Sequence, residues 1–380
     1  MTASRLTEIS PFIVMEVLEK AAAMEKAGRH IIHLEVGEPD FQVPECVREA
    51  SIRAIGEGRT HYTHSLGDPE LREAIAEKYQ QEYQVSVSPN QIIVTSGSSP
   101  AILMALSALC CEGDEVIISD PAYACYANFI RYIGAQTVRV PVSAADGFQL
   151  HADAVRQHIR ENTKAILINS PINPTGNLLS PHTMNELAEL GVPIISDEIY
   201  HGLVYGQKAR CMLEFSRNAF ILNGFSKRYA MTGLRLGYLI APEKYVRSLQ
   251  KLQQNLFICA SSVAQRAGIA ALQDADPEVE QMRRIYNERR VYMIKRLREL
   301  GFIIPVEPTG AFYIFVDASH LSGNSYQLAF DILEKTGVGV TPGIDFGPGG
   351  EGYLRFSYAN SLENIREGLN RLEKYISEIR

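Results

Sequence analysis

TKAILINSPINPTGNLLSPHTMNELAELGVPIISDEIY, residues 163–200, holds two short apolar runs separated by a segment of helical period. The runs, Thr163 to Pro171 and Val192 to Glu198, have the length and composition of buried strands. A strand, a helix and a second strand in this order form a βαβ unit, which joins parallel neighbours in a sheet. The stretch therefore predicts an α/β fold.

The same alternation continues on both sides of this stretch. Four more strands are predicted, at Gln91 to Gly97, Glu115 to Asp120, Thr137 to Val142 and Arg217 to Ser226. Helical segments fill most of the gaps between them, which favours a mainly parallel sheet that is buried on both faces.

The C-terminal third has a different pattern. A long charged helix is predicted from about Pro277 to Leu300, then strands at Ala311 to Asp317 and Tyr353 to Ala359, and an amphipathic helix from Ser361. This change and the length of 380 residues predict two domains. The large domain is expected over residues 46–284, and residues 1–45 and 285–380 are expected to form a smaller α+β domain. We expect the active site at their junction.

Composition argues against several classes of protein. The formal net charge of −7 is spread without long runs of one sign, so neither nucleic-acid binding nor binding to anionic membranes is expected. The N-terminus lacks the apolar core of a secretory signal, and the longest apolar run, Ala101 to Cys111, is shorter than the ~20 residues that span a bilayer. We therefore expect a cytoplasmic protein.

Cysteines and histidines do not form recognisable metal or redox motifs. The six cysteines include no C-x-x-C pair, which favours reduced thiols. His30 with His33, and His61 with His64, have a spacing that could hold a metal, but no cysteine or carboxylate cluster completes either pair. No metal is expected.

Chemically active side chains follow five of the six predicted strands. In an open parallel sheet, ligands bind beyond the carboxyl ends of the strands. The residues at these ends are Gly97, Ser98 and Ser99 after the first strand, Tyr123 after the second, Asn173 after the fourth, Asp197 and Tyr200 after the fifth, and Ser226, Lys227 and Arg235 after the sixth. Together they offer an anion cradle, an aromatic ring, an amide, a carboxylate with a phenol, and an amine.

Each of these features has an ordinary structural explanation when it is taken alone. Gly97 to Pro100 is also a good helix start, and Asn173 to Gly176 is a common turn. A single lysine such as Lys227 is most often a solvated surface residue. Their predicted placement on one edge of one sheet favours a shared site instead.

The set matches the functional groups of one cofactor, pyridoxal 5′-phosphate. Lys227 can form an imine with the cofactor aldehyde and, once displaced by the substrate amine, can act as the base. Asp197 can keep the pyridine nitrogen protonated, which makes the ring an electron sink. Asn173 and Tyr200 can donate to the phenolate oxygen, and Tyr123 can stack on the ring face. The helix start at Gly97, Ser98 and Ser99 can hold the phosphate together with Ser226 and Arg235.

With these residues in place, the sequence resembles the class I and II pyridoxal-phosphate-dependent aminotransferases of fold type I over nearly its whole length. The motifs that carry the resemblance are Leu34 to Phe41 (LEVGEPDF), Tyr62 with Gly67 and Leu71-Arg72, Asn173 to Gly176 (NPTG), Asp197 with Tyr200, Asn223 to Lys227 (NGFSK) with Arg235 to Tyr238 (RLGY), and Phe346-Gly347 followed by Tyr353 to Ser357 (YLRFS). The resemblance implies a mainly parallel seven-stranded sheet in the large domain.

The resemblance also implies roles for residues outside this sheet. Gly37 and Asn173 would contact the substrate, Arg355 would grip its α-carboxylate, and Tyr62 would reach the cofactor phosphate of the neighbouring subunit. The last role implies a homodimer whose active sites are shared across the interface. The structural alternatives are a turn at Gly37, an ion pair at the rim for Arg355, and packing for Tyr62.

One residue departs from the family pattern, and one glycine-rich motif matches a pattern of another kind of protein. Gly224 stands three residues before Lys227, where many relatives have a serine, so one hydroxyl near the phosphate is missing and Ser226 is expected to compensate. Gly347 to Gly352 satisfies G-x-G-x-x-G, but a strand follows it and no βαβ unit fits before the terminus, so it is not expected to bind a dinucleotide.

The resulting hypothesis is an aminotransferase that moves the amino group of an L-amino acid to a 2-oxo acid in two half-reactions. The alternative enzyme on the same scaffold is a C–S β-lyase, since the cofactor alone does not decide which bond at the α-carbon breaks. A transcription regulator with an aminotransferase-like domain is not expected, because only about thirty residues precede His33 and they cannot form a DNA-binding domain.

Two positions suggest the preferred amino donor. Aspartate-preferring members of the most similar branch have a threonine and a lysine at positions that align with Val14 and Ser99. Valine cannot donate a hydrogen bond, and a neutral serine cannot pair with a buried carboxylate. The sequence therefore predicts that aspartate is a poor donor and that a neutral amino acid is preferred.

Overall fold

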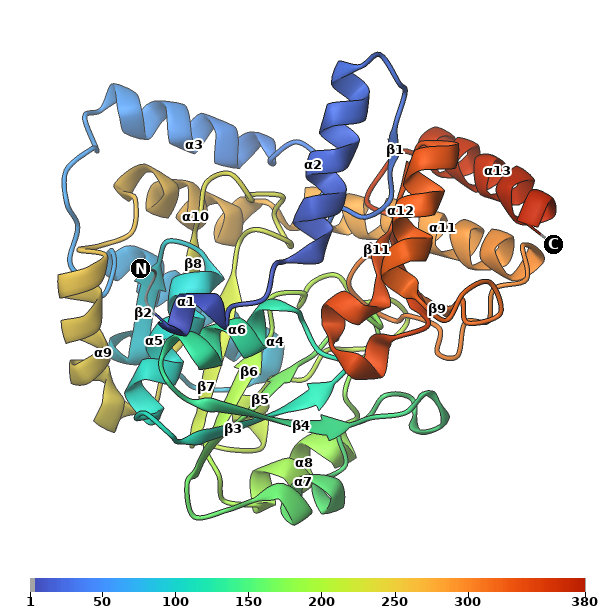
Figure 1. Cartoon of the computed structure of the whole chain (residues 1–380). Coiled ribbons are helices and arrows are strands. Elements are labelled where there is room, and N and C mark those ends of the chain that lie inside the picture. The colour runs from blue at the N-terminus through green and yellow to red at the C-terminus, as the bar shows by residue number, and fades with distance from the viewer. Residues whose placement is uncertain (1–3, 380) are drawn as a thin grey trace.

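A seven-stranded sheet forms the centre of the computed structural model, which describes residues 4–379 (Figure 1). The strand order is β2-β8-β7-β6-β5-β3-β4, and every neighbouring pair is parallel except the two that contain β8. The strands are β2 (Ile92–Thr95), β3 (Glu115–Asp120), β4 (Gln136–Pro141), β5 (Thr163–Asn169), β6 (Ile194–Asp197), β7 (Ala219–Gly224) and β8 (Gly237–Ile240). The predicted α/β class with a mainly parallel seven-stranded sheet is confirmed.

The six strands predicted individually for this sheet are all present, with ends that differ by up to two residues. The predicted strand Arg217 to Ser226, for example, is two residues shorter at each end, because Ser226 and Lys227 belong to the turn that follows β7. No individual strand was predicted at β8. It has four residues and follows β7 without a helix between them, so it lacks the alternation that revealed the others.

The sheet is buried on both faces because successive residues of each strand point to opposite sides. Along β5, Ile166 and Ile168 belong to one apolar core and Leu167 belongs to another. The second core contains residues of α5 (Ser98–Leu109), α6 (Cys125–Tyr132) and α9 (Glu243–Leu256). The first core contains residues of α4 (Pro69–Tyr83), α7 (Ala152–His158), α8 (Pro181–Glu189) and α10 (Ser262–Asp274), and α3 (Glu45–Gly56) packs on α10.

Elements from both ends of the chain form the smaller part of the molecule. Figure 1 shows α2 (Ile13–Lys26) beside the C-terminal elements. A three-stranded antiparallel sheet contains β11 (Thr341–Pro342), β12 (Tyr353–Ser357) and β9 (Tyr313–Asp317), and β1 (Ile32–His33) pairs with β10 (Val338–Gly339). The other helices of this part are α11 (Asp276–Glu299), α12 (Ser325–Thr336) and α13 (Leu362–Ile379), whereas α1 (Ser4–Thr7) lies beside α6 of the large part (Figure 1). This mixture is the predicted α+β character, while the domain boundaries at residues 45 and 285 stay a prediction.

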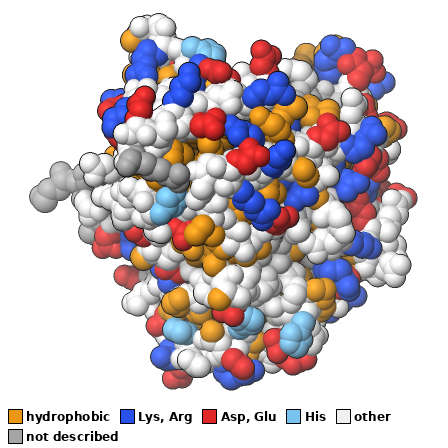
Figure 2. All heavy atoms as spheres, turned by 90° about the vertical axis from the view of Figure 1, so that its right-hand side faces the viewer, with side chains coloured by type: hydrophobic (Ala, Val, Ile, Leu, Met, Phe, Trp, Pro, Cys, Tyr) orange, Lys and Arg blue, Asp and Glu red, His pale blue; other side chains and the backbone are white. Residues whose placement is uncertain are grey.

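Charges of both signs are mixed on the surface. On the face shown in Figure 2, Lys and Arg side chains lie among Asp and Glu side chains. None of the helices within residues 4–379 combines the length and the apolar character needed to cross a membrane.

Candidate active site

The predicted site residues gather where the strand ends of the large sheet meet the smaller part of the molecule. A chain of contacts joins them. The Arg355 guanidinium donates to Asn173 Oδ1 at 2.8 Å, the Asn173 amide donates to Asn169 Oδ1 at 2.7 Å, and Asn169 Nδ2 donates to the Asp197 carbonyl oxygen at 2.8 Å. Lys227 Nζ donates to the Gly37 carbonyl oxygen at 2.5 Å. Residues from five separate motifs therefore form one site.

Lys227 follows the end of β7 and has an unusually acidic ammonium group. The pKa of Lys227 is lowered from 10.5 to about 8: burial is the largest cause, the cations of Arg355 and Arg235 act in the same direction, and the carboxylates of Glu38 and Asp197 oppose the shift. A larger fraction of the amine is therefore neutral near pH 7 than for a solvated lysine. A neutral amine is the form that attacks a carbonyl carbon.

Asp197 ends β6 as a buried carboxylate that is 4% exposed. Tyr126 donates its hydroxyl to Oδ2 at 2.7 Å, and the Ile199 amide donates to Oδ1 at 3.1 Å. Burial raises the pKa of Asp197 from 3.8 to about 6, and these two bonds and Lys227 oppose the rise. A cationic ring nitrogen beside this carboxylate would favour its ionised form. Tyr126 was not predicted, although it lies three residues after Tyr123.

The start of α5 and the loop before β8 form an anion cradle. Gly97 precedes α5 with a φ of +92°, and no side chain caps the helix amides at Ser98 and Ser99. A Cβ atom on Gly97 would lie 2.5 Å from Nη2 of Arg235, and one on Gly237 would lie 2.8 Å from the Ser98 nitrogen. Both glycines are therefore needed to bring a guanidinium against free helix amides, which is a suitable site for a phosphate.

Close packing also explains the glycine three residues before Lys227. A Cβ atom on Gly224 would lie 3.0 Å from the carbonyl oxygen of Leu236 and 3.1 Å from Cα of Gly237. These contacts are tighter than ordinary van der Waals contacts. The serine found in many relatives would need the strand β8 to move. Ser226, which is buried beside this point, stays the predicted source of a hydroxyl.

Arg355 lies in β12 and is 3% exposed. Its Nη2 donates to the Glu35 carbonyl oxygen at 2.7 Å and to Thr341 Oγ1 at 3.1 Å. The guanidinium carbon lies 4.1 Å from the ring centre of Tyr313 and 5.1 Å from that of Phe346, and Nε has no protein partner. Within residues 4–379 no acidic side chain forms an ion pair with Arg355. The alternative of a rim ion pair is therefore wrong, and a buried guanidinium with an unpaired donor suits a carboxylate ligand.

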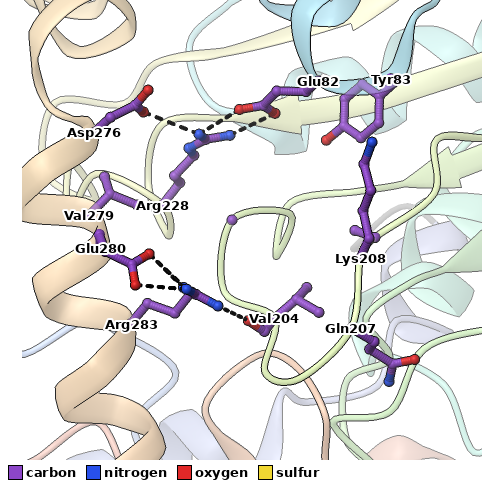
Figure 3. A pocket seen from close by; sticks show the side chains of 12 residues that line it. Glu82, Tyr83, Val204, Gln207, Lys208, Arg228, Asp276, Val279, Glu280 and Arg283 are labelled. Atoms are coloured by element: carbon purple, nitrogen blue, oxygen red, sulfur yellow. Dashed lines mark hydrogen bonds and ion pairs between the residues drawn. The ribbon is translucent and has the colours of Figure 1, made fainter.

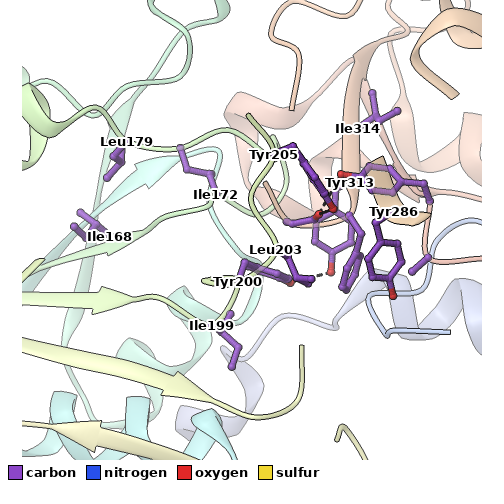
Figure 4. Packing of buried hydrophobic residues seen from close by; sticks show 14 of the residues in the cluster. Ile168, Ile172, Leu179, Ile199, Tyr200, Leu203, Tyr205, Tyr286, Tyr313 and Ile314 are labelled. Carbon is purple, nitrogen blue, oxygen red and sulfur yellow. Dashed lines mark hydrogen bonds between the residues drawn. The ribbon is translucent and has the colours of Figure 1, made fainter. Parts of the chain in front are cut away.

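Tyr313 is a further site residue that the sequence did not reveal. Its hydroxyl lies 2.9 Å from the hydroxyl of Tyr200, and its ring lies against Arg355. Figure 4 shows the two tyrosines side by side. A Cβ atom on Gly37 would lie 2.5 Å from the Tyr313 hydroxyl oxygen. Gly37 is thus required by a close approach within the site. Asn169 was also missed, because its position inside β5 gave no sign of a polar role.

The N-terminal segment lies over Tyr123. The Phe12 and Tyr123 rings meet edge to face with centres 6.0 Å apart, and the Tyr123 and Tyr126 rings meet in the same way at 5.2 Å. Asp345 holds the start of α2 by accepting from the Ile13 amide at 2.9 Å and from the Val14 amide at 3.2 Å. Val14 is buried, so it presents an apolar side chain where the aspartate-preferring relatives have a threonine.

Tyr62 is the one predicted residue that the described chain does not draw into the site. Its side chain is 84% exposed, so packing within its own chain does not explain it. An exposed aromatic side chain of this size suits a contact with another chain.

A separate cavity has a volume of about 480 Å³. Arg228, the residue after Lys227, lines it together with Glu82, Asp276 and Arg283 (Figure 3). The Arg228 guanidinium pairs with both Glu82 oxygens at 2.6 and 2.9 Å, and Arg283 pairs with Glu280. These charges neutralise each other, and none of the residues predicted for the cofactor lines this cavity.

A buried lysine, a buried carboxylate and an anion cradle at the strand ends of an α/β sheet define an enzyme that acts through a phosphorylated aldehyde cofactor. Comparison with known proteins agrees. The family model for aminotransferases of class I and II matches residues 29–372, and the chain belongs to this family.

Relatives of similar length support the same conclusion. The chain is 40% identical to a (5-formylfuran-3-yl)methyl phosphate transaminase from Methanocaldococcus jannaschii, with 100% of both chains covered. It is 39% identical to an aspartate aminotransferase from Pyrococcus horikoshii, with 98% of this chain and 96% of the relative covered.

Solved structures are equally similar. A Methanococcus jannaschii protein, described as similar in its active site to kynurenine aminotransferases, has 40% identity, a TM-score of 0.92 and coverage of 99% and 100%. Aspartate aminotransferase from Thermus thermophilus with maleate has 35% identity, a TM-score of 0.94 and coverage of 98% and 99%. The protein is therefore an aminotransferase that depends on pyridoxal 5′-phosphate. The comparisons give no support to the C–S β-lyase alternative.

Proposed function

We propose that this aminotransferase holds pyridoxal 5′-phosphate on Lys227 and passes the amino group of an L-amino acid to a 2-oxo acid in two half-reactions. The observation that supports this most directly is the pairing of a lysine whose pKa is lowered to about 8 with a buried arginine that has an unpaired donor. The first group suits an aldehyde and the second suits a carboxylate.

The residues present fit the cofactor at each of its functional groups. The Gly97 cradle with Arg235 suits the phosphate, and Asp197 suits a protonated ring nitrogen. Tyr200 and Asn173 would offer a hydroxyl and an amide group to the phenolate oxygen, and Tyr123 lies beside Tyr126, the partner of Asp197. We therefore assign Gly97, Ser98, Ser99, Tyr123, Asn173, Asp197, Tyr200, Ser226, Lys227 and Arg235 to cofactor binding.

The bound cofactor supplies an electron sink for the pair of electrons left when the α-carbon loses its proton. The chain does the rest. Arg355 and the Gly37 segment would orient the substrate carboxylate beside Lys227. The Lys227 amine would be the base that moves the α-proton between substrate and cofactor. Asp197 would keep the ring nitrogen of the cofactor protonated.

The test is the identity of the lysine that carries the cofactor. Borohydride reduction of the holoenzyme followed by peptide mapping should label Lys227. Lys227→Ala should lose the label and several orders of magnitude of turnover, whereas the control Lys208→Ala, in the separate cavity lined by Arg228, should keep both. Labelling of another lysine would overturn the proposal.

We also propose a homodimer in which Tyr62 of each chain reaches the cofactor phosphate of the other. Its support is the 84% exposure of Tyr62 in the single chain and the resemblance described above. Mixing inactive Lys227→Ala chains with inactive Tyr62→Ala chains should restore part of the activity, because one site of the hybrid contains neither substitution. Sedimentation that shows a fully active monomer would contradict the dimer.

The proposed location is the cytoplasm. All six cysteines are unpaired, which suits a reducing compartment. Cell fractionation of the native protein tests this location, and recovery outside the cytoplasm would contradict it.

The proposed amino donor is a neutral L-amino acid, with aspartate a poor donor. The apolar Val14 and the neutral Ser99 provide no partner for a distal carboxylate. The specificity constant for aspartate should be on the order of tenfold to a few hundredfold below that of the best neutral donor. Steady-state assays with aspartate, alanine, leucine and phenylalanine decide this, and a preference for aspartate would refute it.

A further inference from the structure

Tyr313 connects the two ends of the active site. The register between β9 and β12 places Arg355 opposite Phe315, so Tyr313, two residues earlier, is a diagonal neighbour of Arg355 on the same face. The guanidinium lies over the Tyr313 ring at 4.1 Å. The hydroxyl at the far end of the ring reaches Tyr200 at 2.9 Å, as Figure 4 shows. One side chain thus touches the carboxylate side and the cofactor side.

The two phenols share one hydrogen bond, and only one of them can donate it. Each hydroxyl has a single hydrogen. If Tyr200 donates to the cofactor phenolate oxygen, it has no hydrogen left for Tyr313. Tyr313 must then donate to Tyr200, and the Tyr200 oxygen accepts.

The surroundings favour this direction. Burial raises the pKa of Tyr313, and the Arg355 cation is the largest opposing influence, which makes Tyr313 more acidic than burial alone would leave it. Burial raises the pKa of Tyr200 well above its usual value, Tyr313 adds to this rise, and the Arg355 cation opposes it. The more acidic phenol is the better hydrogen-bond donor, which favours donation from Tyr313 to Tyr200.

We propose that Tyr313 is a positioning residue that donates its hydroxyl hydrogen to Tyr200 and so keeps the Tyr200 hydrogen directed at the cofactor phenolate oxygen. This inference rests on the proposed role of Tyr200. Gly37 takes part because it leaves room for the Tyr313 hydroxyl, since a Cβ atom there would lie 2.5 Å from that oxygen.

The experiment uses the holoenzyme and follows the visible absorbance of the bound cofactor as a function of pH. A donor to the phenolate oxygen stabilises its negative charge and lowers the pH midpoint of the absorbance change. Tyr313→Phe keeps the ring and removes only the donor. The midpoint should rise by roughly 0.2 to 0.6 pH unit. The reason is that the charge-assisted bond from Tyr200 to the phenolate oxygen loses the strengthening of about 10–30% that a second hydrogen bond in the chain provides.

Two further variants separate the hydroxyl from the ring and from general effects. Tyr313→Leu removes the ring below Arg355 and should weaken binding of a substrate carboxylate by roughly fivefold to thirtyfold. Tyr313→Phe should leave that affinity within about twofold, since the ring remains. The control is Tyr205→Phe, which removes a nearby buried hydroxyl that donates to the Ala311 carbonyl oxygen at 2.7 Å and should leave the midpoint unchanged.

The outcomes distinguish this inference from the proposed function. Tyr200→Phe should raise the midpoint more than Tyr313→Phe does, and the double variant should match Tyr200→Phe alone. A midpoint that moves with Tyr200→Phe but not with Tyr313→Phe overturns the inference and leaves the role of Tyr200 intact. If Tyr200→Phe does not move the midpoint, the proposed role of Tyr200 is wrong, and the inference about Tyr313 is wrong with it. If Tyr313→Phe is unstable, replacing Tyr313 with the more acidic 3-fluorotyrosine should lower the midpoint, and no change would overturn the inference.

Discussion

The acidic ammonium group of Lys227 makes a quantitative prediction for the apoenzyme. With its pKa at about 8 in place of 10.5, about 10% of the amine is neutral at pH 7, compared with about 0.03% for a solvated lysine. The neutral fraction is therefore about 300-fold larger. The rate of cofactor uptake by apoenzyme should rise with pH and level off above about pH 8. Stopped-flow absorbance between pH 7 and 10 measures it, in a range where the cofactor phosphate is already a dianion.

Replacing a neighbouring carboxylate tests whether the surrounding groups set the pKa of Lys227. Glu38 raises the pKa of Lys227, so Glu38→Gln should move the midpoint of the uptake rate below pH 8. The matched control is Asp40→Asn, which removes a carboxylate in the same segment that pairs with Arg289. A blocked lysine peptide, titrated in parallel, corrects for ionisation of the cofactor itself. A midpoint near pH 10.5, or an upward shift in Glu38→Gln, would refute the reasoning.

Three further substitutions test other parts of the site. Arg355→Ala should weaken binding of the substrate carboxylate by ~2–4 kcal/mol with cofactor uptake nearly intact, measured by spectral titration, and the reverse pattern would make Arg355 structural. Asp197→Ala should keep the cofactor but lose turnover, and normal kcat would remove Asp197 from the mechanism. Burial raises the pKa of Glu198 from 4.5 to about 8 and lowers that of His201 to about 4. Between pH 6.5 and 8, Glu198 is therefore protonated in the folded chain and ionised in the unfolded chain. His201 is mostly neutral in both states over this range, so it contributes little to the pH dependence of stability. Stability of the parent should fall by about 2 kcal/mol relative to Glu198→Gln across this window in urea unfolding, and parallel curves would contradict it.

The sequence predicted the site residues whose position follows from the local pattern of apolar residues. Asp197 and Lys227 each follow a strand that the pattern of apolar residues marks clearly, and the rule that ligands bind at the carboxyl ends of parallel strands placed them together. The same pattern gave two helices and two strands of the smaller part, α11, α13, β9 and β12, because their apolar periods are long enough to recognise.

The residues that were missed act through partners far away in the chain. Tyr313 bonds to Tyr200 across 113 residues, and Tyr126 bonds to Asp197 across 71. Nothing local distinguishes these tyrosines from core aromatic residues, since both are buried and packed against other rings. Strand β8 was missed for a related reason, because its antiparallel pairing with β2 and β7 depends on tertiary packing.

The contact between Glu35 and Arg355 has a consequence for the order in which the working enzyme arises. The two residues are 320 positions apart, and the bond between them holds the guanidinium in the site. At 5–20 residues per second, the ribosome makes Arg355 roughly 15 to 60 seconds after Glu35. The strands of the large sheet are complete by Ile240, so the nascent chain has its lysine and phosphate cradle well before it can recognise a carboxylate. The residues proposed to hold the cofactor are therefore synthesised before the arginine proposed to recognise the substrate carboxylate.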